Sequence, residues 1–316
     1  PQRIPRPLRA AREETRQPPC PCSPGGPQAI MSSMKLSHRH IPVWTMLPAI
    51  LACSMSPGRD PDFSGVDKLL AGAVRSGAFP GCAAAAGSSS GSYWTGGFGT
   101  LALNGKTAGK LSLPAAANPG PGTLYDLASL TKVVGTTSVV AALIQRRKLS
   151  LGDKVSKYLP GFAPASLKKK ERALKEKVTV EQLLLHTSGL PSWRPLFESC
   201  SSYKAMLKII LATPLETAPG TSYRYSDLGF ILLGEVAAKA GGKPLATLEK
   251  KLVFEPLGMR ETLRNPAAAL RKKIAPTELD KETKKYVHGK VHDENARAGG
   301  GITGHAGLFS TTTDLA

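Results

Sequence analysis

The sequence is short of acidic residues, which leaves it strongly basic. Among its 316 residues, 42 are Lys or Arg and only 23 are Asp or Glu, so the formal net charge is +19. A surplus of this kind favours anionic partners such as lipid headgroups or cell-wall polymer. A simple solvated basic surface explains it more economically. No nucleic-acid-binding motif accompanies the charge, so we expect no nucleic acid partner.

Cysteine is also scarce, with five in the whole chain. Two of them fall in the first 30 residues and Cys53 falls in a leader-like segment, which leaves only Cys82 and Cys200. A disulfide between these two is allowed in an exported protein. Cys82 lies in the apolar run 81–87, so a buried free thiol is an equally good interpretation.

Motifs for metals, nucleotides and other cofactors are missing. His288 and His292 have the i, i+4 spacing of zinc ligands on a helix, but Gly289 interrupts the segment and no His-Glu-x-x-His pattern is present. The glycines 299–301 read as a turn and not as a phosphate-binding loop between a strand and a helix. We therefore expect no metal site and no cofactor.

The N-terminal region resembles a bacterial export leader behind a tail. Residues 1–30 are rich in Pro, Arg and Gly without apolar periodicity, so they are expected to be disordered, or untranslated if Met31 or Met34 is the start. The segment 31–53 has basic residues followed by an apolar stretch that is too short to span a bilayer as a helix.

The end of this leader, Ile50-Leu51-Ala52-Cys53, resembles a lipobox, in which the cysteine is acylated and becomes the mature N-terminus. An ordinary secretory leader cut nearby is the alternative. Either interpretation predicts an exported protein, periplasmic or anchored to the membrane through a lipid on Cys53. Residues 54–62 then form a linker and 63–316 the folded domain.

The most informative segment is Leu127-Ala128-Ser129-Leu130-Thr131-Lys132. Positions i and i+3 of a helix share a face, so Ser129 and Lys132 can meet. A serine hydroxyl becomes a good nucleophile when a neighbouring base, such as a neutral amine, takes its proton. This arrangement points to acyl transfer through a covalent serine ester. A helix-capping serine beside a surface lysine is the plain alternative.

The same spacing occurs at Ser32, Ser166 and Ser201, and context separates these from Ser129. The first lies in the leader, the second precedes the charged run 168–172, and the third lies in a polar connection. Only Ser129 opens a long apolar segment, 133–144.

Two later blocks complete a pattern. One is Leu184-Leu185-His186-Thr187-Ser188-Gly189-Leu190-Pro191, and the other begins at Pro219-Gly220-Thr221 and contains Tyr225-Ser226-Asp227. With the Ser129 segment, they resemble the serine β-lactamase-related family, which includes class C β-lactamases, D-Ala-D-Ala carboxypeptidases and EstB-type esterases. The resemblance implies an α+β, β-lactamase/transpeptidase-like fold, with an antiparallel sheet flanked by helices and a helical subdomain.

The resemblance also implies roles for particular residues. Tyr225 matches the tyrosine that acts as base or acid beside the serine. Asp227 stands where the family carries a substrate-binding asparagine, and a carboxylate there removes two N–H donors and adds a charge. An aspartate paired with Lys132 would favour the charged ammonium and weaken the lysine as a base. His186 is expected to form a structural hydrogen bond behind the site.

The third family motif, Lys-Thr-Gly or His-Thr-Gly, has one candidate in His305-Ala306-Gly307. The hydroxyl-rich residues 310–313 before Asp314 read instead as a helix start, so we do not assign it. The chain is then expected to end before that motif, with the C-terminal strands missing and the domain incomplete.

These observations predict an exported serine hydrolase that cleaves an amide, lactam or ester, with Ser129, Lys132 and Tyr225 as catalytic residues. Its substrate would be a small molecule or a peptide, such as cell-wall peptide. A non-catalytic, penicillin-binding-like module that holds cell-wall peptide is the alternative. Strands are expected near 81–87 and 93–103, and helices near 66–75, 180–185, 203–211, 228–240 and 245–254.

Overall fold

The computed structural model describes residues 61–316, apart from 90, 103–117, 201, 281, 282 and 284. The predicted tail, the leader with Cys53, and all but the last two linker residues lie outside the described part. Cys82 and Cys200 lie within it, and both are free thiols.

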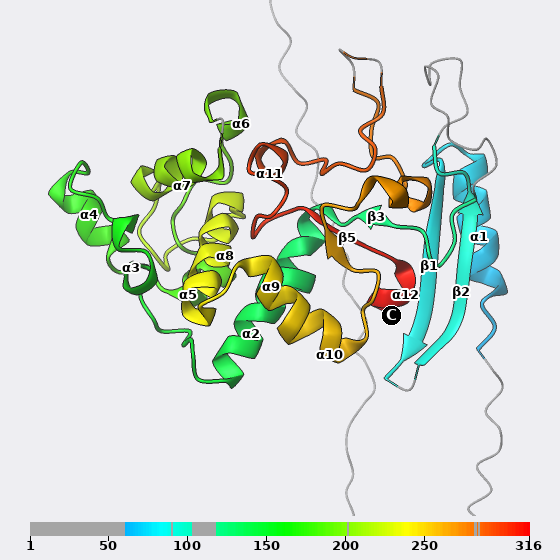
Figure 1. Cartoon of the computed structure of the whole chain (residues 1–316), viewed down its shortest axis with the longest axis horizontal. Coiled ribbons are helices and arrows are strands. Elements are labelled where there is room, and N and C mark those ends of the chain that lie inside the picture. Colours follow the sequence, from blue (N-terminus) through cyan, green and yellow to red (C-terminus); the bar gives the residue numbers. More distant parts are fainter. Residues whose placement is uncertain (1–60, 90, 103–117, 201, 281–282, 284) are drawn as a thin grey trace, which may run out of the picture. The chain divides into compact units, whose positions relative to one another are not determined.

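The first elements form a hairpin covered by a helix. Strands β1 (Gly81–Ser88) and β2 (Gly91–Gly99) pair antiparallel, with Gly81 opposite Gly99. Helix α1 (Ser64–Arg75) packs on β2, next to the stacked rings of Phe63 and Trp94, whose centroids are 5.5 Å apart (Figure 1). The two predicted strands are therefore confirmed, with the second ending at Gly99.

A second sheet, not predicted from the sequence, joins distant segments. It has the antiparallel order β3 (Tyr125–Asp126), β5 (Leu308–Ser310), β4 (Leu263–Arg264). Each of these strands is only two or three residues long, so none carries a readable alternation of apolar and polar residues. The sheet brings the segment before Ser129 against the end of the chain.

The helical run after β3 changes its winding twice. It begins as a 3₁₀ turn (Ala128–Leu130), continues as a π-helical stretch (Lys132–Thr137) and ends as α2 (Ser138–Gln145). By length and composition, 128–145 could cross a membrane. The core helix of a globular domain passes the same test, and here Val139 and Leu143 are fully buried in the main hydrophobic core.

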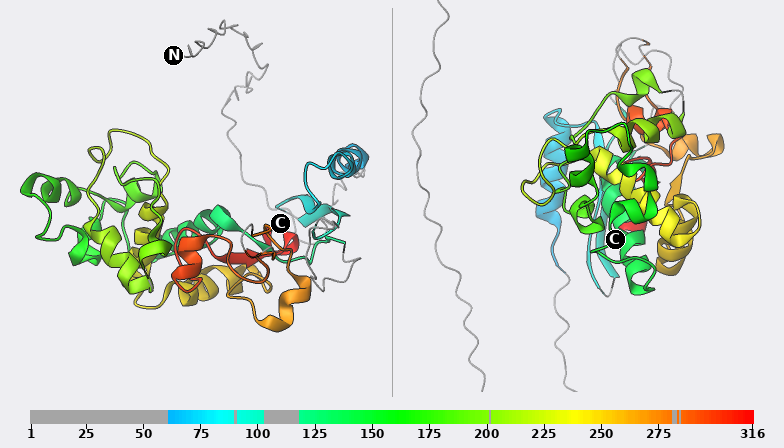
Figure 2. Two further views of the ribbon diagram at one scale, coloured as in Figure 1. Left: turned by 90° about the horizontal axis from the view of Figure 1, so that it is seen from above. Right: turned by 90° about the vertical axis from the view of Figure 1, so that its left-hand side faces the viewer.

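Most of the remaining structure is helical (Figure 2). The longer segments are α4 (Lys169–Lys175), α5 (Val180–Leu184), α7 (Tyr203–Ala212), α8 (Asp227–Gly241), α9 (Leu245–Glu249) with its π-helical continuation η4 (Lys250–Phe254), η5 (Ala268–Lys273) and α11 (Glu294–Ala298). The shortest are α3 (Val155–Tyr158), η3 (Pro160–Phe162), α6 (Leu196–Ser199), α10 (Glu255–Leu257) and α12 (Thr312–Leu315).

Helix α8 lies at the centre of the core. Its apolar residues are buried almost all round because α2, α5, α7 and α9 all pack against it. The helices expected near 66–75, 180–185, 203–211, 228–240 and 245–254 are present, and α12 begins where the hydroxyl-rich run predicted a helix start. The charged run 168–172 leads into α4, and its lysines 168–170 are exposed to solvent. Lys175, further along the same helix, is completely buried.

Candidate active site

The predicted nucleophile lies on a sharp turn between β3 and the helical run. Ala128 has φ +44°, a left-handed conformation that costs a residue with a Cβ roughly 1–2 kcal/mol. Ser129 follows it, exposed to solvent, and its Oγ accepts a hydrogen bond from Lys132 Nζ at 2.9 Å. The serine and lysine therefore meet as predicted.

Lys132 is buried, with only 3% of its surface exposed. Besides Ser129, its ammonium donates to the carbonyl oxygen of His305 at 3.0 Å and lies 2.7 Å from Asp227 Oδ1. An ammonium has three N–H donors, and three oxygens surround this one. A surface lysine beside a capping serine is thus the wrong interpretation of this pair.

Tyr225 and Asp227 enter the site from the start of α8. Ser226 caps this helix, because its Oγ accepts the Gly229 N–H at 3.0 Å while donating to the carbonyl of Pro191 at 2.6 Å. The cap fixes the residues on either side of it. The Tyr225 ring, 40% exposed, has its centroid 4.8 Å from Lys132 Nζ. Asp227, the residue after the cap, contacts the same Nζ through its carboxylate.

His186 supports this corner from behind. Its Nδ1 accepts the Ser226 N–H at 3.0 Å, and its ring lies 4.5 Å from that of Tyr225, centroid to centroid. Burial, assisted by the positive charge of Lys132, lowers the pKa of His186. A neutral imidazole is the form that can accept at Nδ1. The structural hydrogen bond predicted for His186 is present.

His305 does not face the site as a third-motif residue would. Its ring is 1% exposed and lies between Thr303 Oγ1 and Asp293 Oδ1, each 2.9 Å from a ring nitrogen. Only its backbone carbonyl reaches Lys132. Although burial opposes it, the hydrogen bond from His305 keeps the pKa of Asp293 below its ordinary value.

A family model described as Beta-lactamase matches residues 66–316. The chain belongs to this family.

Curated relatives and solved structures agree with this assignment. A Bacillus subtilis protein named "N-acetylmuramyl-L-alanine amidase" is 36% identical over 217 residues, which is 61% of this chain and 48% of the relative. An Escherichia coli K12 protein named "Putative D-alanyl-D-alanine carboxypeptidase" is 36% identical over 219 residues, 62% of this chain and 49% of the relative. The chain thus spans about half the length of the curated relatives it matches.

The fold is that of the same family. The octameric penicillin-binding protein homologue from Pyrococcus abyssi superposes with a TM-score of 0.59 at 24% identity, covering 81% of this chain and 55% of that one. FmtA from Staphylococcus aureus gives 0.60 at 20% identity, covering 81% and 64%. The predicted family and its α+β, β-lactamase/transpeptidase-like fold are confirmed.

Two features that support the Ser129 site were not found from the sequence. The role of the His305 carbonyl could not be predicted from the sequence, because every residue carries a backbone carbonyl. The buried pair of Arg264 and Glu249 also escaped: the guanidinium donates to both carboxylate oxygens at 2.6 and 3.0 Å, and to the carbonyls of Thr303 and Ala306 at 3.0 and 2.7 Å. This pair supports the turn that carries His305. The glycines near that turn were its only signal in the sequence.

No metal site is found among the described residues, since no cluster of three or more His, Cys, Asp or Glu side chains could hold an ion. His288 Nε2 lies 2.9 Å from the carbonyls of Arg271 and Ile274, and His292 pairs with Glu278 at 3.1 Å. Both histidines therefore have structural partners, and they do not share a helix.

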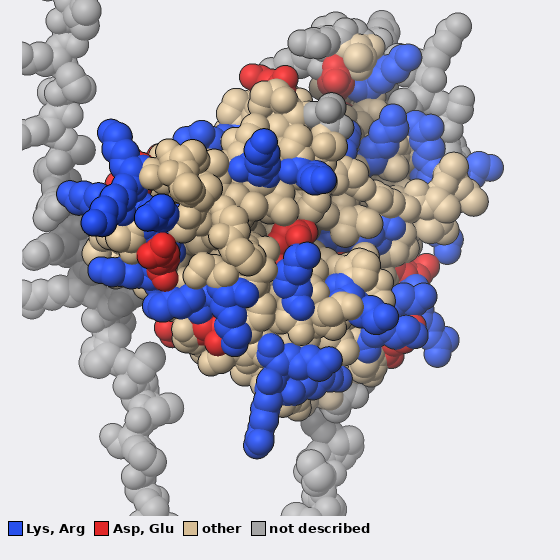
Figure 3. Space-filling view, turned by 60° about the vertical axis from the view of Figure 1, so that its left-hand side comes forward, with Lys and Arg blue, Asp and Glu red and all other residues tan. Residues whose placement is uncertain are grey.

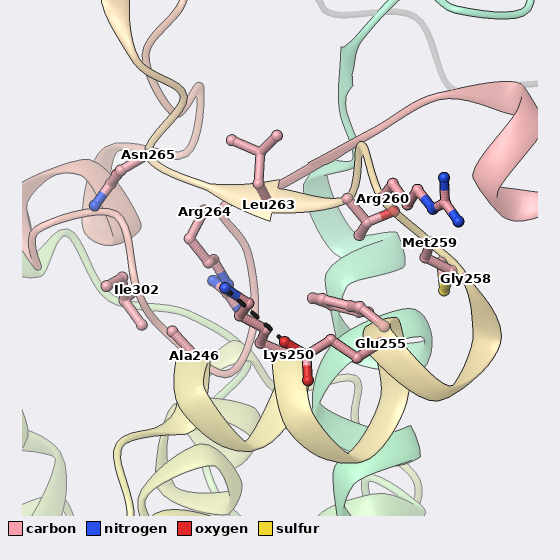
Figure 4. Close-up of a pocket in the computed structure, with 12 residues that line it drawn as sticks. Ala246, Lys250, Glu255, Gly258, Met259, Arg260, Leu263, Arg264, Asn265 and Ile302 are labelled. Atoms are coloured by element: carbon pink, nitrogen blue, oxygen red, sulfur yellow. Dashed lines mark ion pairs between the residues drawn. The ribbon is translucent and has the colours of Figure 1, made fainter.

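A separate cavity lies away from Ser129. It has a volume of about 660 Å³ and lies beside η4, α10 and β4. Figure 4 shows residues that line it, among them Lys250, Glu255 and Leu263. Ser129, Lys132, Tyr225 and Asp227 are not among the residues that line it, so this cavity is separate from the proposed catalytic residues.

Proposed function

We propose that this protein is a serine hydrolase that acts through an acyl-enzyme on Ser129. The observation that carries the proposal is the 2.9 Å hydrogen bond between Lys132 Nζ, buried, and Ser129 Oγ, exposed at a sharp turn. An exposed nucleophile can reach a substrate while its buried partner is shielded from solvent. The family membership and the hydrolase names of the relatives support the same chemistry.

In the proposed reaction, Ser129 Oγ attacks the substrate carbonyl carbon and its proton passes to Lys132, once that lysine is neutral. Tyr225, beside the lysine, relays a proton to the departing amine or alcohol. The Ser129 N–H contributes to the oxyanion site, where one donor is typically worth roughly 3 kcal/mol. Water then attacks the ester carbonyl, releases the acid and restores the serine hydroxyl.

The substrate we favour is a peptide of the cell-wall type, in line with the names of the relatives from Escherichia coli and Bacillus subtilis. The surface around Ser129 is exposed, which suits the binding of an extended substrate. Leu130 and Val133 flank the serine and lysine with 56% and 62% of their surfaces exposed. Exposed apolar side chains of this kind can bind the non-reacting parts of a peptide.

One observation favours the alternative, a module that binds peptide without turnover. Asp227 Oδ1 lies 2.7 Å from Lys132 Nζ in an ion pair, and an ammonium in such a pair has no lone pair to accept the serine proton. Binding a carbonyl compound at Ser129 would then be possible without efficient acylation.

Two probes separate the alternatives. A nitrophenyl ester reports turnover, and a fluorescent penicillin reports covalent capture, with the adduct mapped by mass spectrometry. We expect ester hydrolysis and an adduct on Ser129 alone, both abolished by Ser129→Ala. Reversible peptide binding with neither result would favour the binding module. An adduct on Ser166 or Ser201 would show that the nucleophile is wrongly assigned.

We also propose export, with anchoring through Cys53, on the strength of the Ile50-Leu51-Ala52-Cys53 pattern. Two or more acyl chains give stable attachment to a membrane, whereas one is marginal. Expression from Met31 in a bacterial host and fractionation test this proposal. The protein should be found in the membrane fraction and should incorporate labelled palmitate, and Cys53→Ser should remove the label.

A further inference from the structure

The turn that presents Ser129 is held by a carboxylate two residues before the strained alanine. Asp126 Oδ1 accepts the Ala128 N–H at 2.8 Å, and Asp126 Oδ2 accepts the His292 N–H at 2.7 Å. Both oxygens therefore bind backbone. Asp126 is itself fixed in β3, where it pairs with Phe309 of β5.

The left-handed conformation of Ala128 needs such support. In the described part of the chain, only four non-glycine residues have a positive φ, and Ala128 is the one that directly precedes the nucleophile. A residue with a Cβ keeps this conformation only where its surroundings enforce it. The Asp126 carboxylate enforces it by fixing the direction of the Ala128 N–H, and the φ of Ala128 in turn sets where Ser129 points.

The second contact of Asp126 leads to the segment that holds the base. His292, whose N–H binds Asp126, is followed by Asp293, and Asp293 hydrogen-bonds His305 at 2.9 Å. The carbonyl of His305 accepts from Lys132 at 3.0 Å. One carboxylate thus links the backbone at the nucleophile to the backbone that holds its partner lysine.

We propose that Asp126 is a positioning residue for Ser129: it holds Ala128 in the left-handed conformation that directs the serine hydroxyl toward both Lys132 and the substrate. The role deepens the proposed function and rests on it. Asp126 acts through the backbone and does not contact the reacting atoms.

The test uses a fluorophosphonate, which reacts when Ser129 Oγ bonds to phosphorus, fluoride leaves and the hydroxyl proton passes to the base. The second-order labelling rate is measured for the full chain and for Asp126→Ala, Asp126→Asn, Ala128→Gly and the Asp126→Ala/Ala128→Gly double variant. All rates are taken at a temperature at which every variant is folded by circular dichroism.

We expect Asp126→Ala to slow labelling at least tenfold and Asp126→Asn, which retains one acceptor oxygen, to slow it less. Ala128→Gly should restore most of the rate in the Asp126→Ala background, because glycine adopts positive φ without a steric penalty. If Asp126 only stabilised the fold, Ala128→Gly would not be expected to restore the labelling rate of Asp126→Ala. Asp62 supplies a matched control: its carboxylate accepts the Ser64 N–H at 2.8 Å with the same spacing, remote from the site, so Asp62→Ala should label at the wild-type rate.

Labelling of Asp126→Ala at the wild-type rate, or a slow variant that Ala128→Gly does not rescue, overturns the positioning role and leaves the proposed function standing. If Asp126→Ala does not fold, Asp126→Asn and the double variant decide by the same criteria. A wild-type chain that is not labelled on Ser129 overturns the proposed function and the positioning role with it.

Discussion

At the scale of single residues, Asp227 is the most consequential departure from the family pattern. Its carboxylate lies 2.7 Å from Lys132 Nζ, where an amide would carry no charge. The carboxylate forms an ion pair with the ammonium, and it also places a negative charge at the wall of the site. Two unit charges about 6 Å apart interact by about 3 kcal/mol at an effective dielectric constant of about 20, before Lys132 offsets part of that.

We therefore expect Asp227→Asn to raise kcat/KM for neutral nitrophenyl esters, because Lys132 is no longer held in an ion pair and is free to act on Ser129. For β-lactams or peptides with a carboxylate near the scissile bond, the gain should be about tenfold larger, because repulsion is removed as well. Parallel assays of the two substrate classes measure the difference. An equal gain for both would show that Asp227 acts only on the lysine.

Lys175 is a buried lysine. Among the described residues, no carboxylate lies within hydrogen-bonding distance of its Nζ. Its Nζ donates to the carbonyls of Leu211 and Thr213 at 2.7 Å each, at the end of α7, and lies 4.3 Å from the Phe162 ring centroid. Burial lowers the pKa of Lys175 to about 8. These contacts join α4 to α7.

The sign of its effect on stability follows from that pKa. Between about pH 8 and its ordinary value near 10.4, Lys175 is neutral in the folded protein and charged in the unfolded chain, so its contribution to stability rises with pH and is lost as pH falls toward 8. Relative to Lys175→Met, the wild type should gain about 2–3 kcal/mol from pH 7 to pH 10.5 in urea unfolding. The exposed Lys177→Met should show no such change, and a constant difference between wild type and Lys175→Met would contradict the prediction.

At the scale of elements, a buried ion pair joins α9 to β4. Arg264 and Glu249 have side chains only 5% and 0% exposed, and the guanidinium also donates to the carbonyls of the turn 301–306. Removing one partner of a buried pair leaves an uncompensated charge, which typically costs about 3–5 kcal/mol.

Arg264→Met should therefore lower the free energy of unfolding by about 3–5 kcal/mol, and Glu249→Leu/Arg264→Met should recover part of that loss. Chemical denaturation of the single and double variants measures it. Lys251→Ala, which breaks the exposed pair with Glu255 at 2.9 Å, is the control and should cost less than about 1 kcal/mol. A cost for Arg264→Met no larger than that of the control would show that the pair does not organise the turn.

Two glycines, Gly234 in α8 and Gly304 in the turn that holds His305, allow these two segments to approach closely. A Cβ on Gly304 would collide with the carbonyl of Phe230, and a Cβ on Gly234 would lie 2.9 Å from Gly304 Cα. The close approach lets the Gly304 carbonyl accept from Thr136 Oγ1 at 2.7 Å, and it keeps the neighbouring His305 carbonyl against Lys132.

Gly304→Ala should force the two segments apart, cost about 1–3 kcal/mol and slow acylation of Ser129. Gly152→Ala is the matched control, because its Cβ would meet nothing within 4 Å. Thermal melting and fluorophosphonate labelling of both variants give the two readouts. Labelling of Gly304→Ala at the wild-type rate would show that the His305 carbonyl is not needed to place the lysine.

At the scale of the molecule, positive charge predominates on the face in Figure 3, where lysine and arginine side chains outnumber acidic ones. Exposed lysine and arginine residues cluster along the chain in the segments 168–177 and 271–273. Such charges attract anionic surfaces over about one Debye length, roughly 10 Å at 0.1 M salt and 3 Å at 1 M.

We expect the Cys53→Ser chain to sediment with vesicles containing anionic lipid at 50 mM NaCl and to remain in solution at 1 M. Replacing Lys168, Lys169 and Lys170 by Glu should weaken the low-salt binding, whereas vesicles of neutral lipid should bind neither form. Co-sedimentation measures all of these. Salt-independent binding would show that apolar contacts, and not charge, attach the chain.

The sequence by itself determined the family, the α+β class, the hairpin, the main helices and the meeting of Ser129 with Lys132. The family and the fold class came from the resemblance carried by three motif blocks. The hairpin, the helices and the Ser129–Lys132 pair are local properties, because apolar periodicity, turn residues and a spacing of three within one helical run can be read from neighbouring positions. The hydrogen bond of His186 was also predictable, but only through the resemblance that its motif carried.

The tertiary structure alone decided what surrounds Lys132. The ion pair with Asp227 was foreseen only as a possibility, while the His305 carbonyl, the Arg264–Glu249 pair and the Asp126 contact join segments up to 173 residues apart. Backbone carbonyls and N–H groups are the same in every residue, so no sequence pattern marks the ones that matter. Their roles arise only when β3, β5 and the glycine-rich turn pack together and exclude water from the groups between them.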